Sequence, residues 1–138
     1  MKRSPLRKRK KKSEITKLND RLWELCKILV RAMYGNTCFT CGRTGLTGQN
    51  YQTGHFIPRS TCGAFLKYDL RNLRPQCFHC NINLGGNGAV FYRRMVEVEG
   101  QKYVDEIFRD KNKITQSSMF YNLLVIHYEE RIKDLSTP

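Results

Sequence analysis

The sequence lacks any long run of apolar residues. Its N-terminus is polar and basic, so an apolar signal segment is absent, and no stretch approaches the ~20 apolar residues that a transmembrane helix needs. We therefore expect a cytoplasmic protein with no membrane partner.

Acidic residues are scarce, since 12 Asp and Glu face 25 Lys and Arg and give a formal net charge of +13. Residues 1–12 hold eight of these cations and no acid. Such a segment has nothing to bury, so we expect a disordered basic arm that binds DNA phosphates. A solubilising tail or a nuclear localisation signal would look the same. The arm residues assigned to DNA are Lys8, Arg9, Lys10, Lys11 and Lys12.

The chain also lacks an internal repeat, a helix-turn-helix pattern and finger-type Cys/His spacing, which argues against a transcription factor. It has instead two Cys-x-x-Cys pairs, Cys38/Cys41 and Cys77/Cys80. Two such pairs form the four-thiolate shell of a structural zinc, and without an export signal disulfides are disfavoured. Outside these pairs, we expect Cys26 to be a buried residue of a helix, and Cys62 receives no role.

The pattern predicts a mainly helical α+β protein in which residues 13–138 form one domain behind the arm. We expect an N-terminal helix over 13–35, begun by Ser13 and ended by Gly35. A zinc-stapled core follows over 36–98, and helices occupy 99–138. The last helix, from about 118 to 135, is expected to pack against the first, with a homodimer as the alternative.

Three polar residues suggest chemistry in the core. His55 follows a predicted short strand, and an imidazole with a pKa near 6.5 can take a proton from water at neutral pH. Asn72 can fix its tautomer through a hydrogen bond. Asn81 directly follows Cys80 and can offer an amide oxygen to Mg²⁺ or Mn²⁺.

The order of these elements resembles a nuclease family. It runs Cys-x-x-Cys, Gly54-His55-Phe-Ile-Pro, Asp69-x-x-Asn72, Cys-x-x-Cys-Asn81 and Gly-Gly-Asn87. This order resembles the HNH (His-Me finger, ββα-metal) nucleases over residues 36–95, and most closely the lambdoid phage NinG/Rap recombination proteins. The layout is also similar to phage endonuclease VII.

The resemblance implies a ββα-metal fold and metal-dependent cleavage of branched DNA such as Holliday junctions, D-loops and flaps, in the bacterial host cytoplasm if the gene is a phage gene. It makes His55 the general base, Asn72 the residue that holds the site, and Asn81 the ligand of a catalytic Mg²⁺ or Mn²⁺. Gly54 departs from the pattern, because many HNH enzymes have an acidic ligand before the histidine. The cation then needs a further ligand, for which Asn87 and then Asp69 are the first candidates.

Several arginines surround the motif and are predicted to contact phosphates, namely Arg59, Arg71, Arg74, Arg93 and Arg94. His79 lies inside the second cysteine pair and is predicted not to bind zinc, because four cysteines already complete the shell. The competing hypothesis is a non-catalytic zinc module that binds nucleic acid and recruits a recombination partner.

Overall fold

The computed structural model describes residues 9–114 and 117–137. Lys8, with the rest of 1–8, lies outside the described residues, while residues 9–12 are exposed and have no regular structure. The elements in chain order are α1 (Glu14–Tyr34), the 3-10 turn η1 (Gly48–Asn50), β1 (Gln52–His55), α2 (Ala64–Lys67), the 3-10 turn η2 (Leu70–Asn72), β2 (Leu73–Gln76), the π-helical turn η3 (His79–Asn83), α3 (Gly88–Glu99), α4 (Gln101–Arg109) and α5 (Ser118–Ser136). The predicted mainly helical α+β class is confirmed.

The bounds of α1 follow from its capping residues. The Ser13 side chain accepts a hydrogen bond from the backbone N–H of Thr16 at 3.2 Å, which satisfies one of the free donors of the first turn. Gly35 ends the helix with φ +71°, in the left-handed region that glycine adopts without steric cost. Both ends were predicted from the sequence.

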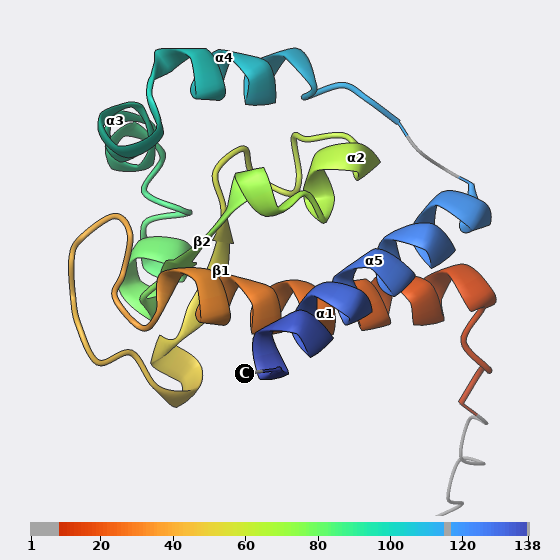
Figure 1. The fold of residues 1–138 in the computed structure, drawn as a ribbon. Coiled ribbons are helices and arrows are strands. Elements are labelled where there is room, and N and C mark those ends of the chain that lie inside the picture. The colour runs from red at the N-terminus through yellow and green to blue at the C-terminus, as the bar shows by residue number, and fades with distance from the viewer. Residues whose placement is uncertain (1–8, 115–116, 138) are drawn as a thin grey trace, which may run out of the picture.

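Helices α1 and α5 pack against each other and form one layer of the molecule (Figure 1). Their core includes Leu22, Leu25, Leu29 and Tyr128. Cys26 is fully buried in this core, and burial raises the pKa of its thiol to about 12, so it packs as an uncharged residue. The predicted packing of the last helix on the first is confirmed.

A second core lies on the other side, under α3 and α4 (Figure 1). It joins Phe91 and Met95 of α3 and Ile107 of α4 to Phe56 and Ile57, which follow β1 directly. The ribbon of β1 and β2 lies between the two layers. The residues just after His55 are therefore anchored in one core, while η2, through Leu70, is anchored in the other.

The two strands pair antiparallel, with Gly54 opposite Arg74 and His55 opposite Leu73. The backbone N–H of Phe39 donates to the carbonyl of Pro75 at 2.8 Å, so the first cysteine pair is attached to β2. This register brings the histidine segment and both cysteine pairs together.

Arg74 is a buried cation at the centre of the fold. It is fully buried, lies over the Tyr34 ring at 4.5 Å, donates to the Leu73 carbonyl at 2.7 Å and pairs with Glu99 at 3.1 Å. A phosphate contact requires an exposed side chain, so the prediction that Arg74 binds DNA is wrong. It ties the end of α1 to β2 and to the end of α3.

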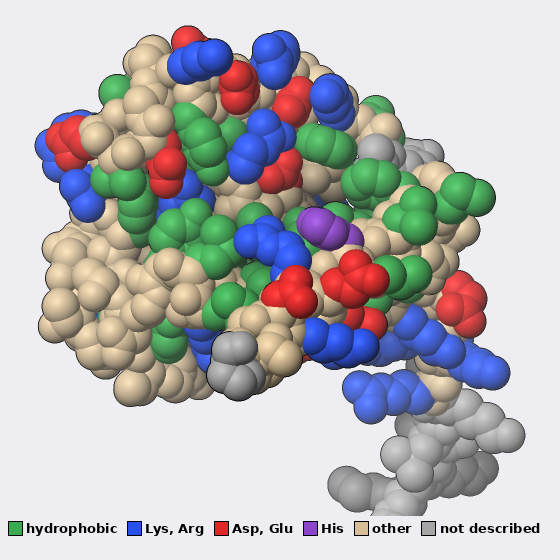
Figure 2. All heavy atoms as spheres, viewed as in Figure 1, with side chains coloured by type: hydrophobic (Ala, Val, Ile, Leu, Met, Phe, Trp, Pro, Cys, Tyr) green, Lys and Arg blue, Asp and Glu red, His purple; other side chains and the backbone are tan. Residues whose placement is uncertain are grey.

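On the face drawn in Figure 2, basic and acidic side chains are mixed over the upper helices. The clearest gathering of Lys and Arg borders the grey atoms at the lower right, where the basic N-terminal segment enters α1. In the described ranges no helix is long and apolar enough to cross a membrane.

Candidate functional site

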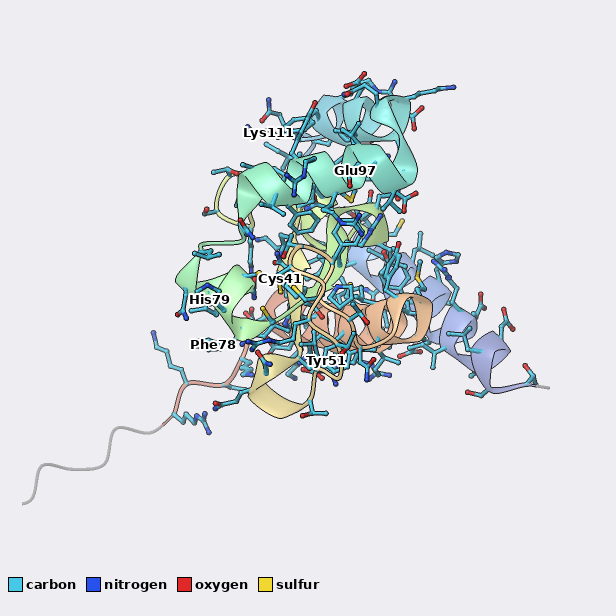
Figure 3. The ribbon with its side chains drawn as sticks, turned by 90° about the vertical axis from the view of Figure 1, so that its left-hand side faces the viewer. Cys41, Tyr51, Phe78, His79, Glu97 and Lys111 are labelled. Atoms are coloured by element: carbon cyan, nitrogen blue, oxygen red, sulfur yellow. The ribbon has the colours of Figure 1, made fainter. Side chains whose placement is uncertain are left out.

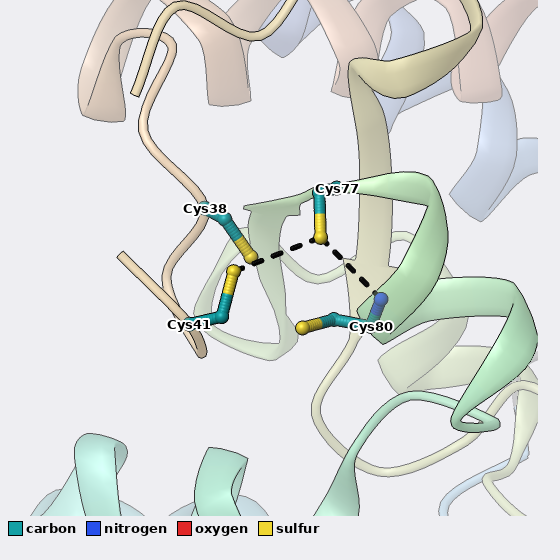
Figure 4. A group of neighbouring side chains, drawn as sticks. All are labelled: Cys38, Cys41, Cys77 and Cys80. Carbon is teal, nitrogen blue, oxygen red and sulfur yellow. Dashed lines mark hydrogen bonds between the residues drawn. The ribbon is translucent and has the colours of Figure 1, made fainter. Parts of the chain in front are cut away.

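The four paired cysteines converge on one point (Figure 4). Their Sγ atoms all lie within 4.8 Å of one another, and those of Cys41 and Cys77 are 3.7 Å apart. A tetrahedral zinc with bonds of about 2.3 Å sets its thiolates about 3.8 Å apart. The cluster can hold a metal ion, and its donor set and spacing fit zinc.

Hydrogen-bond donors surround these sulfur atoms. The backbone N–H of Cys80 donates to Cys77 Sγ at 3.4 Å, and the Asn87 amide donates to Cys80 Sγ at 3.7 Å. Burial raises the pKa of Cys38, but hydrogen bonds from the Cys41 backbone and the Thr40 side chain outweigh burial and lower this pKa to about 6. Such donors stabilise thiolates and orient them.

Asn87 therefore serves the cysteine cluster. It precedes α3 in the left-handed region, with φ +54°, and its amide points at Cys80. It does not line the open hollow that His55 and Arg59 border. The prediction of Asn87 as a ligand of a catalytic cation has no support here, because the backbone turn directs its side chain to the sulfur.

His79 takes no part in the cluster, as predicted. It is exposed, its Nδ1 lies 3.3 Å from the Asn83 amide, and Figure 3 shows His79 and Phe78 at the outer edge of the molecule.

The His55 ring is held on two sides. It stacks on Trp23 of α1, with ring centroids 5.2 Å apart and planes 11° apart, and its Nε2 lies 3.0 Å from the Lys67 carbonyl oxygen. A carbonyl only accepts, so Nε2 carries the proton and Nδ1 has the free lone pair in the neutral ring. Burial lowers the pKa of His55 below its ordinary 6.5, which keeps the ring neutral at pH 7.

Asn72 is fully buried and holds the backbone after His55. Its Oδ1 accepts from the N–H of Ile57 at 2.7 Å, and its amide donates to the carbonyls of Ile57 at 3.1 Å and Leu66 at 3.3 Å. Asn72 therefore fixes the loop on which His55 lies, and it makes no hydrogen bond to the imidazole.

His55 and Asn81 line one open hollow of about 600 Å³, the histidine hollow. Its other lining residues are Pro58, Arg59, Ser60, Lys67, Gly85 and Gly86. The Asn81 amide donates to Gln52 Oε1 at 2.8 Å, and among the described residues its Oδ1 has no hydrogen-bond partner. The hollow thus offers a neutral imidazole, an amide oxygen and two cations, and no carboxylate of the described residues lines it.

Gly54 has a steric reason to be glycine. A Cβ there would lie 1.9 Å from Oε1 of the buried Gln76 side chain. Gln76 cannot move freely, because its amide donates to the Gly86 carbonyl at 2.9 Å and to Thr40 at 3.2 Å. The acidic ligand that precedes the histidine in the HNH pattern has no room in this fold.

Asp69 and Arg71 pair with each other instead of serving the hollow. The Asp69 carboxylate caps η2 through the Arg71 backbone N–H and accepts from its guanidinium at 2.6 Å, while Arg71 also pairs with the buried Asp110 at 2.9 Å. Neither residue lines the histidine hollow, so the predictions of Asp69 as a cation ligand and of Arg71 as a phosphate contact have no support from the geometry of the hollow.

The other predicted basic residues are accessible. Arg59 is exposed at the rim of the histidine hollow. Arg93 and Arg94 lie on α3, each beside Glu97, at 3.8 and 3.2 Å. Surface pairs of this kind are weak, so these arginines remain available to phosphates.

Sequence reasoning missed Trp23, Lys67 and Gln52, which position His55 and Asn81. For Trp23 a signal was present, because Trp23, Lys27 and Arg31 follow each other at steps of four along one face of the predicted helix. Lys67 contacts His55 through its backbone carbonyl, and no sequence pattern reveals such a contact.

Comparison with known proteins decides the family. The family model described as "Bacteriophage Lambda NinG protein" matches residues 1–137. The chain belongs to the NinG family. It is similar to the protein ninG of Escherichia phage 933W (31% identical), of Salmonella phage P22 (31%) and of Escherichia phage lambda (30%), in each case over 99 residues, 71% of this chain and 47% of the relative. The chain spans about half the length of these NinG relatives.

The NinG assignment corrects the wider resemblance. Placing the chain among the HNH nucleases, beside endonuclease VII, is wrong, because the family that matches nearly the whole chain is NinG. The NinG proteins were the group that the sequence motifs resembled most closely. No solved structure matches the chain. The mainly helical fold and the cysteine cluster stand, but the predicted HNH core has no support.

Proposed function

We propose that this NinG-family chain is a DNA endonuclease that uses His55 to activate water, assisted by Mg²⁺ or Mn²⁺, with a structural zinc in the cysteine cluster. The observation that carries the proposal is the state of His55. Its Nε2–H is bonded to a carbonyl, its Nδ1 has no hydrogen-bond partner among the described residues, and the ring lines an open hollow with two cations. This is the arrangement of a general base beside an anionic substrate.

The residues of the hollow divide the work of phosphodiester hydrolysis. Nδ1 of His55 takes the proton of an attacking water, and the Lys67 carbonyl stabilises the imidazolium that results through Nε2–H. Arg59 and Lys67 offset the charge on the phosphate. A divalent cation, when bound, would add to this neutralisation, and Asn81 Oδ1 is the amide oxygen in the hollow suited to hold it.

The substrate we propose is branched DNA of the kind formed in recombination, such as Holliday junctions, D-loops and flaps. The excess of positive charge supports a polyanionic partner. The branch preference follows from the resemblance to the NinG/Rap recombination proteins, so the assay must include unbranched duplex DNA.

One observation favours a different function. In the part of the chain that the structure describes, no carboxylate lines the histidine hollow, and a side chain at position 54 would collide with Gln76. A cation bound only by an amide, water and phosphate would be weakly held. This favours a non-catalytic zinc module that binds nucleic acid and recruits a partner.

The deciding experiment is cleavage of labelled Holliday-junction, flap and linear duplex DNA with and without added Mg²⁺ or Mn²⁺. Replacing His55 by Ala should reduce cleavage by about 10²–10⁴-fold, the usual loss for a general base. His127→Ala, an exposed histidine on α5, is the matched control and should cleave like the wild type. Cleavage by His55→Ala at the wild-type rate, or no cleavage of any substrate by the wild type, would favour the binding module.

A further inference from the structure

A second hollow adjoins the histidine hollow and is lined by one face of α1. It has a volume of about 270 Å³, and its lining includes Trp23, Lys27, Arg31, Tyr51, Gln52 and Asn81. Asn81 lines both hollows. Trp23 lines the second hollow and stacks on His55, which lines the first. The boundary between them therefore contains Trp23, which stacks on the proposed base, and Asn81, the proposed cation ligand.

The charge of this α1 hollow is of one sign. Lys27 and Arg31 line it, and none of its lining residues within 9–114 and 117–137 is acidic. Lys27 pairs with Glu24 at 2.6 Å outside the hollow, but the Glu24 side chain is 59% exposed, and such surface pairs contribute little. The Lys27 ammonium can therefore exchange this partner for a phosphate.

Arg31 is oriented for a ligand before one arrives. Its guanidinium lies over the Tyr51 ring at 4.3 Å and donates one hydrogen bond to the Tyr51 carbonyl at 3.1 Å. A guanidinium has five N–H donors in a rigid fork, so several remain for a phosphate. Gln52 in the same hollow adds an amide that already accepts from Asn81.

We propose that the α1 hollow is a second DNA subsite, in which Lys27 and Arg31 bind the backbone phosphate next to the one presented to His55. The same strand then runs from Arg59 and Lys67, across Asn81, to α1. The phosphodiester backbone suits this hollow because it is polyanionic and repeats along the strand. This inference rests on the proposed function for the order of the phosphates, but the binding of DNA can be measured without cleavage.

The test compares two double variants in buffer without divalent cations. Lys27→Gln/Arg31→Gln removes the two cations of the hollow. Lys102→Gln/Arg109→Gln removes one Lys and one Arg from exposed positions of α4, in the opposite layer of the molecule (Figure 1). Binding of labelled single-stranded and duplex oligonucleotides is followed by anisotropy as the salt concentration is raised. Both variants change the net charge equally, so a general charge effect would move both alike.

The α1 variant should bind DNA more weakly than the α4 variant, and the slope of log K against log salt should fall by about 0.9 per lost contact on duplex and about 0.7 on single strands. Equal slopes for the two variants would overturn the proposal. If Arg31→Gln disturbs folding through Tyr51, Lys27→Gln alone carries the test, since its loss of one contact should still exceed that of Lys102→Gln.

Cleavage separates this inference from the proposed function. The α1 variant should raise KM for DNA and leave kcat near the wild-type value, because these contacts bind substrate and transition state alike. If binding and KM are unchanged while His55→Ala abolishes cleavage, the endonuclease proposal stands and the subsite fails. If His55→Ala cleaves normally, the endonuclease proposal fails whatever the binding data show.

Discussion

The cysteine cluster and the histidine hollow lie next to each other, beside the strand pair β1–β2, but they differ in composition. The cluster consists of four identical side chains, whereas the hollow combines side chains of different types and roles. Cys38, Cys77 and Cys80 are each 1% exposed, and four chemically identical ligands meet at one point. The hollow is open, and its three predicted residues do three different things. The imidazole is stacked and hydrogen-bonded, Asn72 is buried behind it, and Asn81 faces the space.

This difference explains which features the sequence reveals. Equivalent ligands must converge, so their spacing alone identifies the site. The roles of His55, Asn72 and Asn81 depend instead on the residues that contact each of them, and those residues come from distant parts of the chain. Four experiments can test this contrast, and their expected effects decrease in the order given.

Replacing Cys77 by Ser should abolish zinc retention and unfold the chain at ambient temperature. Zinc ligation contributes about 10–16 kcal/mol of apparent folding free energy in small domains, as much as the ~5–15 kcal/mol stability of a typical protein. Elemental analysis and circular dichroism report the outcome. Cys62→Ser, outside the cluster, should keep both metal and fold. A Cys77→Ser protein that is folded and free of zinc would show that the fold does not depend on metal binding by the cluster.

Removing Asn72 should destabilise the fold much more than removing Asn81. Asn72→Ala removes the hydrogen-bond partner of both the N–H and the carbonyl of Ile57 in the interior, and each such group costs about 1–3 kcal/mol. The Leu66 carbonyl also loses a bond but still accepts from the backbone N–H of Asp69. Asn81→Ala loses one half-buried hydrogen bond, worth about 1 kcal/mol. Urea denaturation measures both variants. Equal losses of stability in the two variants would show that Asn72 is no more important to the fold than Asn81, contrary to this prediction.

Gly54→Ala should cost about 1–3 kcal/mol, as overpacking of a dense interior usually does. The added Cβ would meet Gln76 Oε1 at 1.9 Å, and moving Gln76 would break its bonds to Thr40 and Gly86. Gly88→Ala is the control, because a Cβ there has no atom within 4 Å. Unchanged stability at position 54 would mean that an acidic residue is absent for another reason.

The titration of His55 should be visible in the fluorescence of Trp23, the only tryptophan of the chain. Burial lowers the pKa of His55, the Lys67 carbonyl opposes this, and the charges of Arg59 and Lys67 lower the pKa further. The midpoint should therefore lie below 6.5. The stability that depends on the neutral ring is present above pH 6.5 and is lost as the pH falls through the folded-state pKa.

This transition should disappear in His55→Gln and persist in His127→Ala. A midpoint above 6.5 would show that the carbonyl bond outweighs burial and the neighbouring charges, contrary to this prediction.

Much of the fold could be predicted from local signals. The ends of α1 follow from Ser13 and Gly35, and the packing of α5 on α1 follows from its apolar pattern. The sequence also placed His55 and Asn81 in one site, because both adjoin segments fixed by the cysteines. What it missed depends on long-range contacts. From the sequence alone Arg74 is expected to be a surface cation, but in the fold Tyr34 and Glu99 pack against it and bury it.

The register of the ribbon has a consequence for the order of assembly. Its strands are four residues each, and an isolated hairpin of this size is marginal in water. A slip of one residue would turn His55 to the opposite face. The cysteine pairs before β1 and after β2 can hold the two strands in place once a metal joins them. A newly made chain would therefore acquire a correctly aimed His55 only when it takes up its metal, and the lag before it becomes competent would be set by the supply of that metal.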